Sequence, residues 1–154
     1  MQGDHWLQGY VPYLLYRATN KLNIRLLERL RETRTNPSRW RVLSVLKAHG
    51  TLNVGEIADH TLTEQSTVSR VIAQLEREGR VIRKTSRKDS RVIRVELTPK
   101  GTATFEAILP AALQHQQVAL QGIKRGDIQV LVRVLAQIEK NIDEPARRRR
   151  RKPT

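Results

Sequence analysis

Between Thr63 and Gly101 the chain reads TEQSTVSRVIAQLEREGRVIRKTSRKDSRVIRVELTPKG. A polar, hydroxyl-rich run with helical periodicity comes first, and two short β-prone runs follow it, with the basic turn Ser86–Arg91 between them. A winged helix-turn-helix has this order, because one helix enters the major groove of DNA while a hairpin reaches the backbone or minor groove beside it. The order therefore predicts a DNA-binding protein.

The helix expected over Glu64–Glu78 separates apolar from polar side chains. Its apolar face should pack on the core, and it consists of Val68, Val71, Ile72 and Leu75. On the polar face, Arg70 suits the edge of a guanine and Gln65 or Gln74 that of an adenine, whereas the short hydroxyls suit phosphates or thymine edges. A solvated face without a partner is the alternative. We expect DNA contacts from Thr63 (also the helix cap), Gln65, Ser66, Thr67, Ser69, Arg70, Gln74 and Arg77.

The turn Ser86–Arg91 is the expected wing. Within six residues it carries three cations and one acid. Because Asp89 precedes Arg91 by two positions, its carboxylate is expected to orient the Arg91 guanidinium, so that less side-chain entropy is lost when the arginine enters a narrow minor groove. A charged hairpin loop without a partner is the alternative. The DNA contacts expected in this turn are Arg87, Lys88, Asp89 and Arg91.

Periodicity and capping signals place the other helices and strands. Asn36-Pro37 should start one helix and Gly50 should end it, and Asn53 with Glu56 should form a capping box. The expected helices are Gly9–Thr33, Pro37–His49, Val54–His60, Glu64–Glu78, Pro99–Gln121 and Arg125–Ile142, and the expected strands are Arg80–Thr85 and Val92–Leu97.

Two prolines mark the C-terminal part. Pro110 predicts a kink or a break inside a long helix, and Pro145 predicts the close of the fold. From Ala146 onward the sequence is typical of a solvated tail, with six cations in the run Arg147–Lys152. This tail is expected either to raise solubility or to engage phosphates of DNA or of a ligand.

The chain is strongly basic, with a net charge of +14 over 154 residues. Without the run Arg147–Lys152 the remainder still carries +8. Such a surplus attracts polyanions, nucleic acid before anionic membrane. No apolar run approaches the roughly 18 residues of a membrane span, and no signal peptide is visible. We therefore expect a cytoplasmic protein with no membrane partner.

Neither a metal centre nor catalysis is indicated. There is no cysteine, which excludes thiolate ligands and disulfides, and the four histidines are scattered without metal-ligand spacing. No glycine-rich phosphate loop or Ser/His/Asp arrangement occurs. We expect no enzyme activity, no metal and no cofactor.

Together these features resemble the MarR family of bacterial transcription regulators. The resemblance rests on the helix-turn-helix run IADHTLTEQSTVSRVIAQLEREG (57–79), on the wing signature Asp89-Ser90-Arg91, and on the step LTPKG (97–101) into the next helix. The order of helices and strands also matches, from about residue 9 to 142. The turn HTLTEQ is more polar than is usual in the family, and the arginine-rich tail is not one of its hallmarks.

The resemblance implies a mainly α fold with a small β-wing. A winged helix-turn-helix lobe (36–98) would join a helical dimerisation layer (1–35 and 99–143), and residues 144–154 would form a basic tail. It implies a homodimer on pseudo-palindromic double-stranded DNA, with half-sites about 10 bp apart. The fourth helix would lie in the major groove and Arg91 in the minor groove.

Many members of this family are released from DNA by small aromatic or anionic ligands, bound in a crevice between dimerisation layer and winged lobe. Tyr13, Tyr16 and Arg17 share one helix face, and aromatic rings beside an arginine suit an aromatic carboxylate, such as a phenolic acid, or its coenzyme A thioester. Packing of the tyrosines in the dimer interface and of Trp40 in the core is the alternative. The expected ligand residues are Tyr10, Tyr13, Tyr16, Arg17, Arg39 and Trp40.

The sequence thus predicts a sequence-specific transcriptional regulator, in the first place a repressor that a small ligand releases from DNA. The alternative is a non-specific architectural DNA-binding protein without a ligand switch, which the net charge of +14 favours. A footprint on DNA separates them, since a short protected palindrome supports the regulator and uniform coverage supports the architectural protein.

Overall fold

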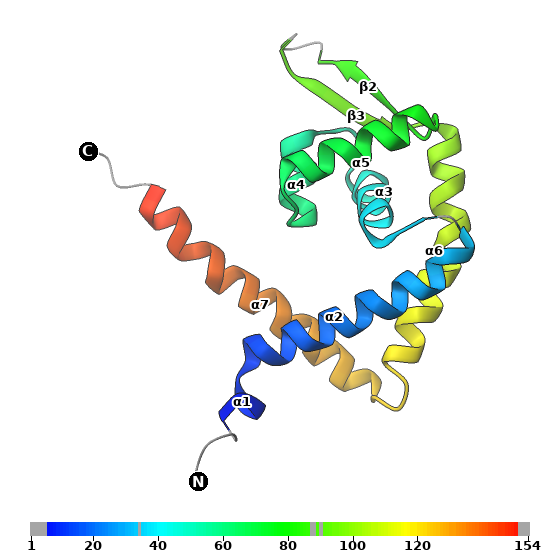
Figure 1. Ribbon diagram of the computed structural model, residues 1–154. Helices are drawn as coiled ribbons and strands as arrows, with labels where there is room; N and C mark the ends of the chain where they lie inside the picture. Colours follow the sequence, from blue (N-terminus) through cyan, green and yellow to red (C-terminus); the bar gives the residue numbers. More distant parts are fainter. Residues whose placement is uncertain (1–5, 34, 87–88, 90, 151–154) are drawn as a thin grey trace. The chain divides into compact units, whose positions relative to one another are not determined.

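The computed structural model describes residues 6–33, 35–86, 89 and 91–150, with the side chains of residues 32 and 144–150 outside the description. By its internal contacts the chain divides into two compact units, residues 1–115 and 116–154, which are described separately below. The predicted fold class is confirmed, because helices dominate and the strands form one small antiparallel sheet. Figure 1 shows the elements in chain order.

The first unit holds most of the elements. Its helices are α1 (Trp6–Gly9), α2 (Val11–Leu30), the short 3-10 helix η1 (Arg31–Thr33), α3 (Pro37–His49), α4 (Val54–Thr61), α5 (Gln65–Arg77) and most of α6 (Pro99–Ala119). Its strands are β1 (Leu52–Asn53), β2 (Val81–Thr85) and β3 (Ile93–Leu97). The second unit contains the end of α6 and α7 (Arg125–Arg150).

Capping signals in the sequence account for the ends of α3 and α4. The Asn36 side chain accepts a hydrogen bond from the backbone N–H of Arg39 at 3.0 Å, and Gly50, with φ of +77°, follows the last residue of α3. Asn53 and Glu56 form the predicted reciprocal capping box at α4, with both bonds at 2.8 Å. These predictions are confirmed.

The start of α5 differs from the prediction. Thr63 does not cap the helix, because its hydroxyl donates to the carbonyl of Thr61 at 3.1 Å, and Glu64 occupies the cap position without a side-chain bond. The preceding Leu62 has a left-handed backbone, with φ of +49°. This left-handed residue ends α4 and turns the chain toward α5, and the Thr63 hydroxyl is used within that turn.

The sheet has the strand order β1-β3-β2 and is antiparallel throughout. The two longer strands form the predicted hairpin, with Val81 opposite Leu97 and Thr85 opposite Ile93. Strand β1 was not predicted, because two residues are too few to show alternation. Only its pairing with β3 defines it, with Leu52 opposite Val95 and Asn53 opposite Arg94. The sheet therefore ties the hairpin to the segment between α3 and α4.

One hydrophobic core holds this unit together. Trp40 of α3 also stacks on Phe105 of α6, with ring centroids 5.1 Å apart. The fully or nearly buried core side chains come from α2, α3, β1, α4, α5, both hairpin strands and α6. They are Leu30, Val42, Leu43, Leu46, Leu52, Ile57, Ala58, Val68, Ile72, Leu75, Val81, Val95 and Ile108.

The LTPKG step fastens the start of α6 to the end of α5. The Thr98 hydroxyl donates to the carbonyl of Gly79 at 2.7 Å and accepts from the backbone N–H of Gly101 at 3.0 Å. The backbone N–H of Thr98 donates to the carbonyl of Arg80 at 3.1 Å. A Cβ on Gly101 would lie 1.9 Å from that same carbonyl oxygen. Only glycine fits this close approach.

Neither of the prolines inside the two C-terminal helices ends its helix. Helix α6 continues through Pro110, so of the two predicted outcomes, a kink or a break, the break does not occur. Helix α7 extends to Arg150 rather than ending near Ile142, and Pro145 does not terminate it. A proline removes its own N–H bond and crowds the carbonyl four residues before it, which disfavours a helix without forbidding it. In α7 the alanine and arginines that follow Pro145 are favourable helix formers. None of the helices in the described part is long and apolar enough to cross a membrane.

Candidate nucleic-acid interface

Helix α5 separates its side chains as predicted. Val68, Ile72 and Leu75 are at most 1% exposed, and Val71 is half-buried against the same core. The residues from which DNA contacts are expected lie on the opposite side of the helix or at the border between its polar and apolar sides. Of the expected DNA contacts, Gln65, Ser66, Arg70, Gln74 and Arg77 are exposed, while Thr63, Thr67 and Ser69 are half-buried.

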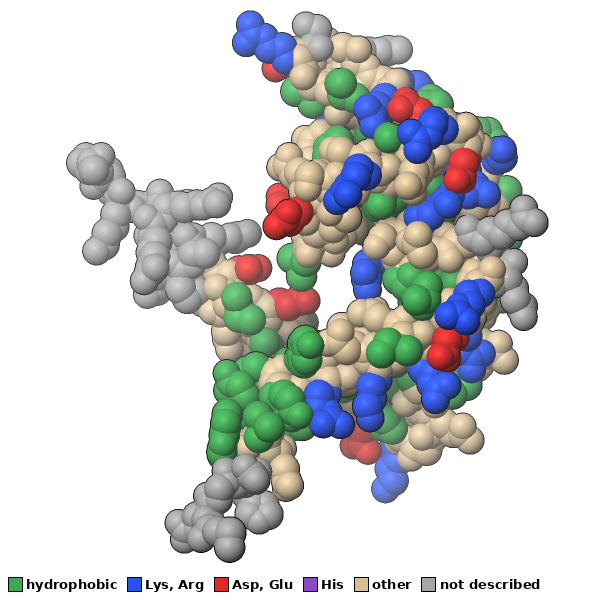
Figure 2. Space-filling model, in the orientation of Figure 1, with side chains coloured by type: hydrophobic (Ala, Val, Ile, Leu, Met, Phe, Trp, Pro, Cys, Tyr) green, Lys and Arg blue, Asp and Glu red, His purple; other side chains and the backbone are tan. Residues whose placement is uncertain are grey.

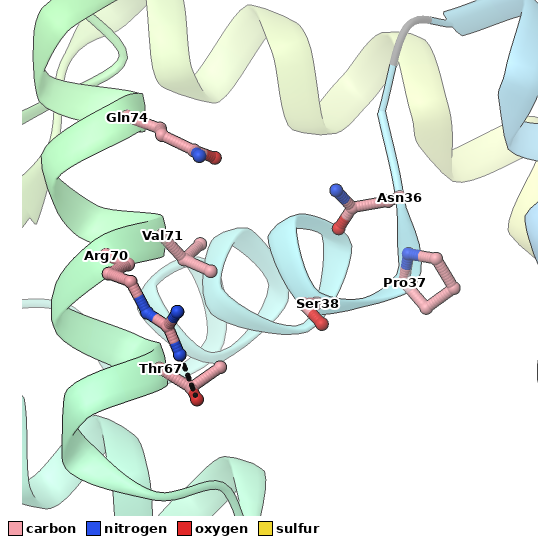
Figure 3. A pocket seen from close by; sticks show the side chains of 7 residues that line it. All are labelled: Asn36, Pro37, Ser38, Thr67, Arg70, Val71 and Gln74. Atoms are coloured by element: carbon pink, nitrogen blue, oxygen red, sulfur yellow. Dashed lines mark hydrogen bonds between the residues drawn. The ribbon is translucent and has the colours of Figure 1, made fainter.

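A depression of about 460 Å³ lies between the polar side of α5 and the first turn of α3 (Figure 3). On the α5 side, the Arg70 guanidinium donates to the Thr67 hydroxyl at 3.2 Å. This bond uses one of its five N–H groups, so the others remain for an acceptor in the depression. The full lining is Asn36, Pro37, Ser38, Thr67, Arg70, Val71 and Gln74.

The α3 side of this depression was not expected from the sequence. Asn36 and Pro37 were interpreted only as a helix start, and Ser38 was not singled out. No pattern along the chain could indicate that Ser38 shares a surface with Gln74, because the two are brought together by the packing of α3 against α5. The polar surface around Arg70 is therefore wider than one helix.

The wing turn is organised by Asp89. Its carboxylate accepts from the backbone N–H of Arg91 at 2.9 Å, and its carbonyl accepts from the N–H of Val92 at 3.0 Å. The carboxylate therefore holds the backbone of the turn, and the prediction that it orients the Arg91 guanidinium is wrong in this structure. Arg87 and Lys88 lie outside the described residues.

Figure 2 shows Lys and Arg side chains over the region of α5 and the hairpin, with acidic side chains among them. Two cations of β2 are paired with glutamates within the lobe. Arg83 pairs with Glu76 at 3.3 Å, and Lys84 pairs with Glu96 across the hairpin. The hydrogen bond from Lys84 holds the pKa of Glu96 below its ordinary value. These pairs join elements of the fold to one another.

Other arginines of the same region are not paired in this way. Among the described residues, Arg70, Arg77 and Arg91 form no ion pair within the chain. All three are exposed, and two of them belong to the polar side of α5. An exposed guanidinium without an internal carboxylate is available to a phosphate or a guanine edge.

Of the expected ligand residues, Tyr13 and Arg17 are in contact. The Arg17 guanidinium donates to the Tyr13 hydroxyl at 3.1 Å and lies 5.6 Å from the centre of its ring. This hydrogen bond raises the pKa of Arg17 above its ordinary value. Tyr10 packs against Trp6, and Tyr16 is 66% exposed. The predicted shared face of Tyr13 and Arg17 on α2 is thus present.

The expected ligand residues of α3 have other partners. Arg39 pairs with Glu78, and Trp40 stacks on Phe105. Within the described residues, no recorded hydrogen bond, ion pair or ring contact joins either of them to the tyrosines of α2. A second depression, of about 300 Å³, contains Trp40 but none of the other five expected residues. Its lining is Trp40, Arg41, Ser44, Val45, His60, Thr61 and Leu62.

The described side chains offer little to a metal ion. No group of three or more His, Cys, Asp or Glu residues converges within the described part of the chain. The rings of His49 and His60, which are far apart in sequence, stack at the ends of α3 and α4 with centroids 4.1 Å apart. Two ligands do not make up the usual four-coordinate site.

Comparison with known proteins gives the same architecture. Residues 35–93 match the MarR family. The repressor MdtR of Bacillus subtilis is 35% identical over 109 residues, which are 71% of this chain and 70% of that protein. A MarR family regulator from Silicibacter pomeroyi is 32% identical, with a TM-score of 0.84 over 93% of this chain and 97% of that one.

A third relative is described with a small molecule. BpsR of Bordetella bronchiseptica is 25% identical, with a TM-score of 0.76 over 84% of this chain and 98% of that one. Its structure concerns the regulation of its DNA binding by 6-hydroxynicotinic acid. From the lobe geometry and these matches, the chain belongs to the MarR family of DNA-binding transcriptional regulators and not to a family of enzymes.

Proposed function

We propose that the chain binds a specific pseudo-palindromic site on double-stranded DNA as a homodimer and represses transcription until a small aromatic or anionic ligand releases it. The observation that carries the DNA part is the distribution of arginines. Those that stabilise the lobe are paired with glutamates, whereas Arg70, Arg77 and Arg91 are exposed and carry no such partner among the described residues.

In this proposal α5 enters the major groove and the hairpin lies beside it. Arg70 pairs with a guanine edge, while Gln65 and Gln74 contact adenines, and the hydroxyls contact phosphates or thymine edges. Arg91 enters the minor groove, from a turn whose backbone Asp89 holds. Ser38 of α3 lies across the depression from Arg70 and Gln74, and we add it to the contact surface.

Exposed apolar side chains support a dimer. A large, continuous patch of exposed apolar side chains is unusual on a monomer and marks a surface that another protein covers. We assign residues 1–35 and 99–143 to the dimerisation layer, and we expect the two recognition helices of such a dimer to lie about one DNA turn apart. On α2 the large exposed apolar residues are Val11, Leu14, Tyr16, Leu22, Ile24 and Leu27, and on α7 they are Val130, Leu131, Val132, Val134 and Ile142.

The proposed effector is a small aromatic acid or its coenzyme A thioester. Tyr13 and Arg17 offer a ring and a cation in contact on α2, and the relative BpsR is regulated by a hydroxylated aromatic acid. Release requires that the ligand bind more tightly to a dimer whose recognition helices are wrongly spaced. The shift in DNA affinity is then limited to that difference in ligand affinity.

The experiment begins with duplexes selected by the protein from a random-sequence pool. A regulator should enrich a short inverted repeat and protect it in a footprint, whereas enrichment of no sequence and uniform protection would support the architectural alternative. The enriched duplex is then titrated with a panel of hydroxylated aromatic carboxylates and their coenzyme A thioesters. Release by none of them would contradict the effector class while leaving the DNA assignment intact.

A further inference from the structure

Three charged side chains converge where α5 ends. The Glu78 carboxylate, one residue beyond α5, accepts hydrogen bonds from Arg39 of α3 and from Arg80, which leads into β2. These side chains are 36%, 12% and 22% exposed, respectively. One carboxylate therefore joins three elements of the lobe in a largely covered position.

This cluster contains two cations and one anion. The Nε atoms of Arg39 and Arg80 are buried and have no hydrogen-bond partner. The carboxylate of Glu78 is the anion that both guanidiniums share, so its removal leaves two covered positive charges close together. An uncompensated charge in such a position is strongly unfavourable. Without Glu78, the elements that carry the arginines are expected to move apart.

The cluster adjoins the depression beside Arg70. Gln74, which lines that depression, lies one helical turn before Glu78, and Ser38, which lines its other side, is the neighbour of Arg39. The backbone next to Glu78 is also held, since Gly79 and Arg80 accept hydrogen bonds from Thr98. The C-terminal end of α5 is thereby fixed against both α3 and the start of α6.

We propose that Glu78 is a positioning residue for DNA reading. It holds α5 at the distance from α3 at which Arg70, Gln74 and Ser38 present one continuous surface to the DNA. The inference rests on the DNA-reading face proposed above. It does not require Glu78 to touch DNA, and the carboxylate would repel a phosphate if it did.

Glu76, in the last turn of α5 and two residues before Glu78, provides a matched control. Its carboxylate pairs with Arg83 of β2 at 3.3 Å and is similarly exposed, but it makes no ion pair with α3. Glu78→Gln and Glu76→Gln each raise the net charge by one, which by electrostatics alone tightens binding to any DNA. A positioning role predicts the opposite sign for Glu78→Gln at the selected duplex.

The measurement is the ratio of affinities for the selected duplex and for a scrambled duplex of the same composition. Glu78→Gln should lower this ratio roughly tenfold, whereas Glu76→Gln should change it less than roughly threefold. Glu78→Asp, which keeps the carboxylate, should restore most of the ratio. Arg80→Lys, which keeps the charge but loses the planar fork, should lower it in the same direction without changing net charge.

Circular dichroism and thermal melting establish that each variant is folded at the assay temperature. If Glu78→Gln does not remain folded, Arg80→Lys decides, and an unchanged ratio in that variant overturns the proposal. Equal ratios for the two glutamine variants also overturn it and leave the cluster a role in stability alone. A wild-type protein that did not discriminate between the duplexes would overturn the DNA-reading face itself, and this inference with it.

Discussion

Helices α5 and α2 show two ways in which an amphipathic helix is used in this chain. Helix α5 buries Val68, Ile72 and Leu75 within its own chain and leaves its polar side exposed. Helix α2, although longer, buries only Leu30 and exposes several large apolar side chains. Helix α5 is therefore packed within its own chain, whereas the apolar surface of α2 stays exposed, as the proposed dimerisation layer requires.

Helix α7 extends this contrast to the second unit. None of its residues from 125 to 143 is buried, and apolar side chains such as Val132 are more than half exposed. We therefore expect the two parts to respond differently to mutation. Changes in the lobe should alter the stability of each chain, and changes on α2 or α7 should alter association.

The start of α6 approaches the backbone of Arg80 closely at Gly101. Gly101→Ala would place a Cβ 1.9 Å from the carbonyl oxygen of Arg80, so the start of α6 must shift. We expect a loss of about 4 kcal/mol in the free energy of unfolding. Gly126→Ala, where a Cβ meets nothing within 4 Å, is the control and should be neutral or slightly stabilising. Urea denaturation of both variants checks this, and equal stabilities would contradict it.

Substitutions of core and of surface apolar residues should differ in whether their effect depends on protein concentration. Ile72→Ala removes a fully buried side chain and should cost about 3 kcal/mol. Val132→Asp changes a side chain that is 62% exposed, so it should leave the secondary structure intact but weaken the dimer. Thermal melts over a range of protein concentrations, with sedimentation, distinguish the two. A dimer unaffected by Val132→Asp would remove α7 from the proposed interface.

Arg70 and Arg91, which form no ion pair among the described residues, should contribute differently to DNA binding. Arg70→Ala should lose about 1–3 kcal/mol of discrimination at particular base pairs. Arg91→Ala should weaken binding to all duplexes and lower the slope of log affinity against log salt by about 0.9. Binding titrations at several salt concentrations measure both effects. Uniform weakening by Arg70→Ala would make it a phosphate contact, and an unchanged slope for Arg91→Ala would contradict the wing assignment.

Leu62 is a place where the lobe itself is strained. Its backbone is left-handed, with φ of +49°, and its side chain is 91% exposed, so burial does not compensate for the conformation. Leu62→Gly should therefore raise the free energy of unfolding by roughly 0.5–1 kcal/mol. Chemical denaturation measures the difference. A destabilised variant would show that the Leu62 side chain makes a stabilising contact.

The smallest expected effect is the pH dependence of the stability that the Lys84–Glu96 pair contributes to the hairpin. The hydrogen bond from Lys84 lowers the pKa of Glu96 in the folded state, so this pair stabilises the fold above the pKa of the unfolded chain. The stabilisation is lost as the pH falls through the folded-state pKa. The stability difference between the wild type and Glu96→Gln should shrink over that acid range. A difference independent of pH would show that the pair contributes nothing through ionisation.

Local signals in the sequence predicted most of the helices and strands correctly. Asn36, Asn53 and Gly50 act within a few residues of themselves, so their effect is visible in the chain order. The errors arose where local signals compete. Thr63 could cap α5 or bond within the turn, and Pro145 could end α7 or be accommodated by it. Strand β1 was missed because only its partner defines it.

The polar and apolar sides of α5, the wing hairpin and the family resemblance followed from the sequence alone, because each depends on periodicity or on short spacing. The tertiary structure determines which charged side chains form ion pairs within the chain. The pairing of Arg39 with Glu78, and of Arg83 with Glu76, depends on packing between elements, and so does the approach of Ser38 to the surface around Arg70. Spacing along a chain specifies which side of a helix a residue occupies, but only folding determines which distant side chain it meets.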